Sequence, residues 1–441
     1  LEQSPPSRQI SHWLFDELDK EEEEFAKLEA DFEPLDDCAQ DMATRSASST
    51  HEASNSSSIL HSSKLFQVTK STTSNSCSSF TVASKLFSAV KLGGKKAPTQ
   101  LKHRVVMAPM TRQRTGDDGV PGSAVTEFYR QRATDGGLLI SEATNISAYA
   151  RGYYGAPGFY TKEQVKGWKA VTSAVHDKGG KIFNQLWHTG RVSHPLNLPN
   201  EAQPVSASAT NMEGVQSLAT TVQGRLPHPN PRALEISEIP GIVDDYKRAA
   251  ENALEAGFDV PAEWSTDKYG GCPENRARIV FEAIEAILPS VDSNKVGIRL
   301  SPYGTAFGCT DSNPREFYDY VVKRLNDYDL AYLHMVEPRD MQQPAPDAPE
   351  GGVTKIYRKM YNGVMISASG YDGAEARKVV EDGTTDLVAF ARDFISNPDL
   401  VERIRTGAEL NPVNWQTVYV PLDVPYETGY TDYPFLDEKT A

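Results

Sequence analysis

The sequence predicts an α/β protein, a (β/α)8 TIM barrel with a damaged or shortened fourth strand, preceded by a disordered N-terminal extension. Two observations in the 441-residue chain predict this fold. Short apolar segments alternate with amphipathic segments of helical length after Lys85, and polar residues gather where the apolar segments end. Alternation alone also suits a doubly wound sheet, and the count of units, seven good strands and one poor one, favours the barrel.

The extension, residues 1–84, differs in composition from the predicted barrel, residues 85–441. Residues 16–41 are strongly acidic and residues 46–84 are rich in Ser and Thr, so they bury too little apolar surface to fold alone. An apolar stripe at helical spacing interrupts the acidic part, at Leu14, Leu18, Phe25, Leu28, Phe32 and Leu35. Such a helix either docks onto a partner protein or the barrel, or forms only transiently in water.

The strand candidates are short and almost continuously apolar, as expected for strands buried on both faces. They are Arg104–Pro109, Leu138–Glu142, Lys181–Trp187, Val296–Ser301, Ala331–Glu337, Gly363–Ala368 and Asp386–Ala391. Helical segments are expected over Glu163–Lys178, Ile239–Ala256, Glu274–Leu288 and Pro314–Asp327. The fourth strand should follow Asp259, where Pro261 interrupts it, and proline belongs at the edge or end of a sheet.

Charge and cysteine usage exclude several classes of function. A net charge of −15 argues against a nucleic-acid or membrane-surface protein. The four cysteines have no disulfide or metal-site spacing, so we expect no metal and a reducing compartment. No apolar run approaches the roughly 18 residues that span a bilayer, and the first residues lack the apolar core of a secretory signal. A cytoplasmic location is the expectation.

Polar residues follow several of the predicted strands, at the end of the barrel that carries active sites. Thr111 follows the first strand, Gln185 lies near the end of the third, and Arg299 lies within a later one. Gly370 and Arg392 follow the last two strands, where barrels commonly bind phosphate. By residue type alone, Arg299 could equally form a structural ion pair, and Gln185 could only bridge strands.

The local sequences carry a resemblance to the old yellow enzyme family. The matching blocks, in family order, are Val105–Arg112, Ser141–Thr144, Gln185–Arg191, Asp267–Gly271 with Glu274–Arg276, Arg299–Pro302, Val336–Arg339, Phe394–Asp399 and Gly429–Pro434. The resemblance as a whole covers residues 85–435. The resemblance implies FMN at the mouth of the barrel and NADPH or NADH as reductant. It implies hydride transfer to the alkene of a small α,β-unsaturated carbonyl substrate.

The resemblance also places roles on individual residues. Thr111 and Tyr430 are the implied catalytic residues, the first at the flavin C4 carbonyl and the second lining the substrate pocket. Arg299 is implied beside the flavin N1–C2 edge, where a fixed guanidinium stabilises the charge that reduction adds. The implied cofactor-binding set is Ala108, Pro109, Met110, Thr111, Ala143, Gln185, Arg299, Ser369, Gly370, Ala391 and Arg392. Ser369 and Ala391 stand where the family commonly has glycine, and the segment before Tyr430 is longer than usual.

The largest departure lies at the fourth strand. Only six residues, Val260 to Ser265, separate two intact family motifs. The resemblance implies a His–x–x–Asn or His–x–x–His pair that binds the substrate carbonyl and a tyrosine that donates a proton, and neither has a counterpart here. Three readings follow: an ene-reductase with impaired acceptor chemistry or its oxidase-like remnant, a non-catalytic flavin-binding scaffold, or an ordinary reductase whose recorded sequence lacks this segment.

Overall fold

The computed structural model describes residues 84–93, 99–210, 212, 215, 217–263, 272–339, 344–419 and 425–437. The N-terminal extension lies outside these residues, apart from Ser84. Its predicted disorder, its apolar stripe and the boundary at Lys85 therefore stay predictions. In the part of the chain that the structure describes, no helix is both long and apolar enough to cross a membrane.

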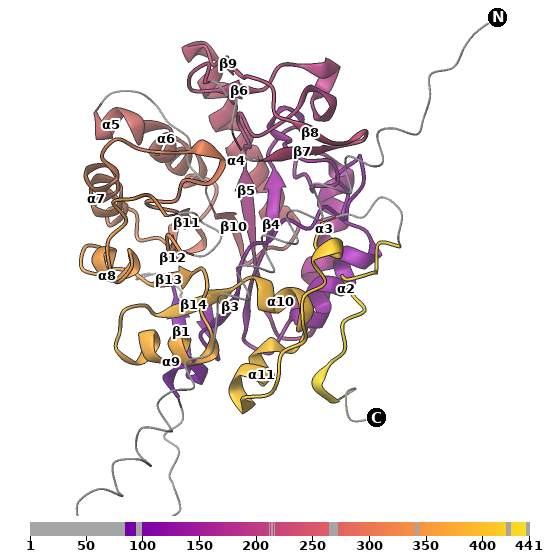
Figure 1. The fold of residues 1–441 in the computed structure, drawn as a ribbon, viewed down its shortest axis with the longest axis vertical. Helices are drawn as coiled ribbons and strands as arrows, with labels where there is room; N and C mark the ends of the chain where they lie inside the picture. Colours follow the sequence, from indigo (N-terminus) through magenta and orange to yellow (C-terminus); the bar gives the residue numbers. More distant parts are fainter. Residues whose placement is uncertain are drawn as a thin grey trace, which may run out of the picture. The chain divides into compact units, whose positions relative to one another are not determined.

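Eight parallel strands form the central sheet (Figure 1), in the order β10-β5-β4-β3-β14-β13-β12-β11. They are β3 (Val105–Met107), β4 (Leu138–Asn145), β5 (Lys181–Trp187), β10 (Val260–Glu263), β11 (Gly297–Leu300), β12 (Tyr332–Val336), β13 (Met365–Ala368) and β14 (Leu387–Phe390). All seven strands predicted as good are present, and the register between neighbours is parallel throughout.

Helices follow most of these strands and lie around the sheet (Figure 1). They are α2 (Ser123–Arg132), α3 (Lys162–Asp177), α4 (Ile239–Glu255), α5 (Pro273–Arg276), α6 (Arg278–Ile287), α7 (Pro314–Leu325), α8 (Thr354–Tyr357), α9 (Gly373–Glu381), α10 (Arg392–Ser396) and α11 (Leu400–Thr406). Side-chain caps start several of them, including a capping box between Thr161 and Gln164 at α3. The helix predicted over Glu274–Leu288 is divided at Ala277 into α5 and α6.

Successive side chains along each strand point to opposite faces of the sheet, which gives two apolar clusters. Side chains such as Val106, Ile140 and Ile366 join one cluster inside the sheet, while their neighbours join a larger cluster shared with the helices. Across the interior, the rings of Phe183 on β5 and Tyr332 on β12 stack with centroids 5.4 Å apart. Contact between strands that are not neighbours in the sheet means that the sheet curls around this filled centre.

A short antiparallel hairpin closes the end of the barrel where the strands begin. It consists of β1 (Val90–Leu92) and β2 (Thr99–Leu101), and its Leu92 and Leu101 join the interior cluster. Backbone bonds from the residues that follow each hairpin strand reach Ala331 and Gly136, just before β12 and β4. This end is therefore sealed, and the opposite, carboxyl-terminal end is left for function.

The fourth strand is present but short. Its four residues pair with β5 at Val260 and Glu263, with an irregularity between them where Pro261 lies. Among the described residues β10 is an edge strand: it contacts β11, but no ladder joins the two. An edge position is where a proline without an N–H is tolerated, so the expected damage to this strand is confirmed.

Short paired strands also lie in the connection between β5 and α4. A parallel pair is formed by β6 (Val205–Ser206) and β9 (Arg232–Ala233), and an antiparallel hairpin by β7 (Leu218–Thr221) and β8 (Gly224–Pro227). The backbone N–H of Tyr154, in the loop after β4, donates to Thr220 of this hairpin. The connection therefore packs onto the loop that follows β4.

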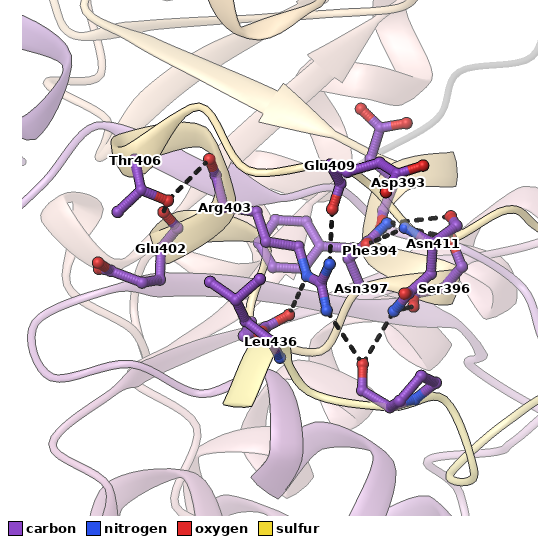
Figure 2. Close-up of polar contacts among 12 residues, drawn as sticks. Asp393, Phe394, Ser396, Asn397, Glu402, Arg403, Thr406, Glu409, Asn411 and Leu436 are labelled. Atoms are coloured by element: carbon purple, nitrogen blue, oxygen red, sulfur yellow. Dashed lines mark hydrogen bonds and ion pairs between the residues drawn. The ribbon is translucent and has the colours of Figure 1, made fainter. Parts of the chain in front are cut away.

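A buried arginine on α11 anchors the C-terminal segment (Figure 2). The Arg403 side chain has no exposed surface, and its Nε donates to Asp399 Oδ1 at 2.6 Å. Its other two nitrogens donate to the carbonyls of Glu409 and Pro434. The second oxygen of Asp399 accepts from the backbone N–H of Leu436 at 2.6 Å. One ion pair thus holds two separate stretches of backbone, at Glu409 and at residues 434–436.

We predict that Arg403→Met destabilises the protein by about 3–5 kcal/mol, because Asp399 and two carbonyls would lose a buried partner. Arg405→Met on the same helix is the matched control, since its ion pair with Glu402 is about half exposed and should contribute about 1 kcal/mol or less. Chemical denaturation followed by tryptophan fluorescence measures both. Equal losses would contradict the anchoring role.

His103, directly after the hairpin, predicts a pH dependence. Its side chain is 4 % exposed and bonds Thr134 Oγ1 through Nε2 at 2.8 Å. Burial, and then the Arg405 cation, lower its pKa from 6.5 to about 4. The unfolded chain therefore binds more protons between these two values, and stability should fall as the pH drops through this window.

We predict that between pH 7 and pH 5 the parent protein loses about 2 kcal/mol more unfolding free energy than His103→Gln, which cannot titrate. Denaturation midpoints at the two pH values give the comparison. Parallel losses in both proteins would show that His103 does not control this acid response.

Candidate active site

The first predicted cofactor segment begins inside the sheet and leaves it at the carboxyl end of β3. Ala108 is buried in the interior cluster, and its N–H donates to Phe390 O of β14 at 2.9 Å. Pro109, Met110 and Thr111 follow and are each partly buried. Among the described residues the Thr111 hydroxyl has no hydrogen-bond partner. It is therefore free to bind a ligand.

Two further predicted contacts lie opposite each other on neighbouring strands. Ala143 on β4 is in register with Gln185 on β5. Gln185 lies two residues after Phe183, so it shares the interior face of the strand, and 7 % of it is exposed. No described residue hydrogen-bonds its side-chain amide, whereas its backbone N–H donates to Ser141 Oγ at 3.3 Å. An amide in this position can donate to a ligand and accept from it.

Arg299 lies on the interior face of β11. Its neighbours Ile298 and Leu300 point outward into the helix-side cluster, so Gly297 and Arg299 face inward. Gly297 is required there, because a Cβ would lie 2.5 Å from the Tyr332 ring. Arg299 is partly exposed and in register with His334 of β12. Arg299 therefore lies inside the barrel, on the strand that follows β10 in sequence, where its guanidinium can face a bound ligand.

The ends of β13 and β14 form two adjoining loops. Ser369 and Gly370 follow β13, and both have positive φ, 93° and 64°. Ala391 follows β14 and caps α10, whose first residue is Arg392. The strands are neighbours, in register through Ala368 and Ala389, so the two loops lie side by side. Backbone groups next to a guanidinium are suited to binding phosphate.

Arg339, after β12, braces the first of these loops. Its Nε donates to Ser369 O at 2.8 Å, and Ser369 Oγ donates back to Arg339 O at 3.0 Å. Its terminal nitrogens form a forked ion pair with Glu375 of α9. Ser369 is therefore held in a conformation that favours glycine, the residue common at this position in the resembling family.

A buried charged cluster lies behind Thr111. Glu142 on β4 has no exposed surface, and burial raises its pKa to about 7 despite the bonds and cations that favour its ionised form. Arg112 and Arg114 also lie in the interior and donate mainly to backbone carbonyls. Their acceptors are Thr417, Val418, Tyr419, Thr428 and Gly429 of the C-terminal segment. The loop after β3 and the C-terminal segment are thus tied together.

Tyr430 lies within this cluster. It is fully buried, with its ring stacked on Phe128 of α2 at a centroid distance of 4.2 Å and the Arg112 guanidinium 4.9 Å from its centroid. Its hydroxyl has no hydrogen-bond partner among the described residues. Burial, followed by Glu142, raises the pKa of that hydroxyl well above its usual value. The substrate-lining role given to Tyr430 stays a prediction, and its position shows a packing role.

Sequence reasoning did not single out Tyr419, which is 46 % exposed. Its carbonyl accepts from Arg114 Nη1 at 2.9 Å. Burial, and then the neighbouring Tyr419, raise the pKa of Tyr153, whose ring stacks on Trp187 at the end of β5. An exposed aromatic therefore lies near the carboxyl ends of the strands. In the sequence, Tyr419 is recognisable only as an aromatic residue directly before the long segment that precedes Tyr430.

The strand order brings the predicted cofactor contacts to one end of the sheet. Gln185, Ala143, Thr111, Arg392 and Gly370 belong to five consecutive strands or their carboxyl ends. FMN requires donors and acceptors for its ring edge, a cation near that edge and a clamp for one phosphate, and these residues together with Arg299 offer all three. The residues therefore fit FMN, and the fold and site define a flavin-dependent barrel oxidoreductase.

Comparison with known proteins gives the family. The model of the NADH:flavin oxidoreductase / NADH oxidase family matches residues 85–261 and 263–411. The chain belongs to this family, so its resemblance to old yellow enzymes is confirmed. It is an FMN-dependent oxidoreductase that uses a nicotinamide reductant. The break in the match falls at Ala262, inside the stretch where the fourth-strand motif is missing.

Individual relatives agree. The chain is 43 % identical over 363 residues to 12-oxophytodienoate reductase 1 of Oryza sativa subsp. japonica, covering 78 % of this chain and 92 % of the relative. A structure of morphinone reductase superposes with a TM-score of 0.73 at 43 % identity, over 81 % of this chain and 98 % of that one. Morphinone reductase in complex with tetrahydroNAD gives a TM-score of 0.72 at 44 % identity, over 81 % and 99 %.

We predict that Ser369→Gly strengthens FMN binding and stabilises the protein by about 1 kcal/mol. Relief of the positive φ gains about 1–3 kcal/mol, and loss of the Oγ bond to Arg339 costs about 1 kcal/mol. Ser369→Ala is the matched control, because it loses the bond but keeps the strain and should destabilise. FMN titration and chemical denaturation test both. Identical behaviour of the two variants would refute the strain argument.

Proposed function

We propose that this protein passes a hydride from NADPH or NADH, through FMN, to the alkene of a small α,β-unsaturated carbonyl. The observation that carries this proposal is the gathering of Thr111, Gln185 and Arg299 at the carboxyl end of one sheet, with the Thr111 hydroxyl and Gln185 amide lacking described partners. Relatives with about the same identity are named as 12-oxophytodienoate and morphinone reductases, which supports an enone-type substrate.

In this proposal the protein's residues hold the cofactor and stabilise charge. When bound, FMN would supply the hydride-transfer chemistry between the nicotinamide and the substrate. Thr111 would hold the flavin C4 carbonyl by a hydrogen bond, Gln185 would bind the ring edge, and Arg299 would stabilise the charge that reduction adds near N1 and C2. Ser369, Gly370, Ala391 and Arg392 bind the phosphate, while Ala108, Pro109, Met110 and Ala143 pack against the ring.

The acceptor half of the reaction is proposed to be impaired. The family's carbonyl-binding His–x–x–Asn or His–x–x–His pair and its proton-donating tyrosine belong to the segment that is missing after Asp259. Loss of one oxyanion-stabilising donor typically lowers the rate by about 10²–10³. Reduction of the flavin depends on Thr111, Gln185 and Arg299 and is proposed to be intact. An oxidase-like remnant that passes electrons to oxygen is the second candidate, favoured by the same missing segment.

The visible spectrum of the purified protein tests both candidates. We expect a flavin band that bleaches when NADPH is added without oxygen. Recovery of the band with 2-cyclohexenone supports the ene-reductase, and recovery with oxygen alone supports the oxidase-like remnant. A coloured protein that NADPH does not bleach would support a non-catalytic flavin scaffold, and a colourless protein would overturn the cofactor assignment for this chain.

Arg299→Gln should slow bleaching by about 10²-fold, because it removes the fixed cation beside the developing charge. The matched control is Arg278→Gln on the exposed face of α6, where the side chain donates to Asn275 Oδ1 at 2.7 Å. Stopped-flow absorbance with NADPH measures the rate in each protein. Equal rates in the two variants would remove Arg299 from the proposed site.

A further inference from the structure

Glu142 is a buried carboxylate for which the proposed chemistry has no direct use. It lies in β4 at the irregular register between Ile140 and Ala143, directly before a predicted flavin contact. Its Oε2 accepts the backbone N–H of Arg112 at 3.0 Å and that of Gln113 at 3.4 Å. Its own backbone N–H donates to Tyr129 Oη at 2.7 Å. One side chain thus ties β4 to the turn that follows β3.

The two amides that Glu142 binds come immediately after Thr111. The turn continues through Gln113, whose φ of 56° is positive although it is not glycine. Such a conformation costs roughly 1–3 kcal/mol and persists only where surrounding contacts enforce it. The paired bonds to a buried carboxyl oxygen are such contacts, because the acceptor is itself fixed by its place in β4. Removing the acceptor should therefore release the backbone beside Thr111.

Filling space does not account for this residue. A buried carboxylate is costly unless cations and donors surround it. Here Arg112, Arg114, Tyr129 and Tyr430 face it, yet its Oε1 has no hydrogen-bond partner among the described residues. The partners of the other oxygen belong to one turn only, the turn after Thr111.

We propose that Glu142 is a positioning residue that places the Thr111 hydroxyl against the flavin through the Arg112 and Gln113 amides, without touching the cofactor. The inference rests on the proposed function, in which Thr111 bonds the flavin C4 carbonyl. It assigns control of the flavin's reduction potential to a side chain outside the ring contacts.

The test asks whether Thr111 still affects the flavin when Glu142 is changed. Thr111→Val is combined with Glu142→Ala, Glu142→Asp and Glu142→Gln, and the midpoint potential of bound flavin is measured in each holoprotein. Loss of the Thr111 hydroxyl bond should shift the potential to a more negative value in the parent protein. The same shift should persist with Gln, which retains an acceptor oxygen. It should disappear with Ala, and with Asp, whose shorter side chain cannot reach both amides.

Glu337 supplies the matched control. It is 4 % exposed, and its carboxylate accepts the backbone N–H groups of Val353 at 2.8 Å and Thr354 at 3.0 Å, in the turn leading into α8. Glu337→Ala removes the same kind of bond from a different turn, so the Thr111→Val shift should persist there. Amide hydrogen exchange of the peptide 108–118 in apoprotein adds a readout without flavin. It should rise in Glu142→Ala and not in Glu337→Ala.

The outcomes separate this inference from the proposed function. A parent protein without flavin overturns both. A flavin-binding parent in which Thr111→Val shifts the potential equally with and without Glu142 overturns the positioning role alone. Loss of the Thr111 effect in the Glu337→Ala background as well means general loosening and also overturns it. Loss confined to Glu142→Ala and Glu142→Asp, with rescue by Glu142→Gln, supports it.

Discussion

The common direction of eight short strands is the constraint on which the rest of this structure depends. Because all neighbours pair in parallel, every carboxyl end lies on the same side, and residues distant in sequence meet there. The opposite end is filled by the β1–β2 hairpin and the Phe183–Tyr332 stack. Inside the barrel, polar side chains such as Gln185 and Arg299 therefore lie on the carboxyl-terminal side of this apolar core, where a ligand can replace water.

Arginine bonds to backbone carbonyls tie the C-terminal segment to this end. Arg112 donates to the carbonyls of Val418 and Gly429, and Arg114 donates to that of Tyr419. Arg403 donates to the carbonyls of Glu409 and Pro434. A guanidinium with several donors satisfies carbonyls that no helix or strand supplies with partners. The backbone at the exposed Tyr419 and the turn after Thr111 are therefore joined by hydrogen bonds from the same arginines.

Much of the fold was predictable because continuous apolar segments and the 3.6-residue period are local signals. The seven good strands and the helices α3, α4 and α7 fall where the pattern predicted them. The break at Ala277, the buried place of Tyr430 and the positive φ of Ser369 depend on contacts between distant segments. In the sequence, Glu142 is recognisable only as the polar last residue of the second predicted strand. Its bonds to Arg112 and Gln113 arise from strand pairing that composition does not encode.

The central sheet keeps its eight parallel strands although the fourth one is short. Within the described residues, β10 pairs with β5, and no ladder joins β10 to β11. The residues proposed to contact the flavin belong to β3, β4, β5, β11, β13 and β14 or their carboxyl ends, and none lies on β10. In the proposed function, cofactor binding and acceptor activation are therefore carried by separable parts of the barrel, since the proposed ring contacts lie on other strands than the one that lacks the family's carbonyl-binding pair. In such an architecture, electron uptake and electron delivery can be lost independently.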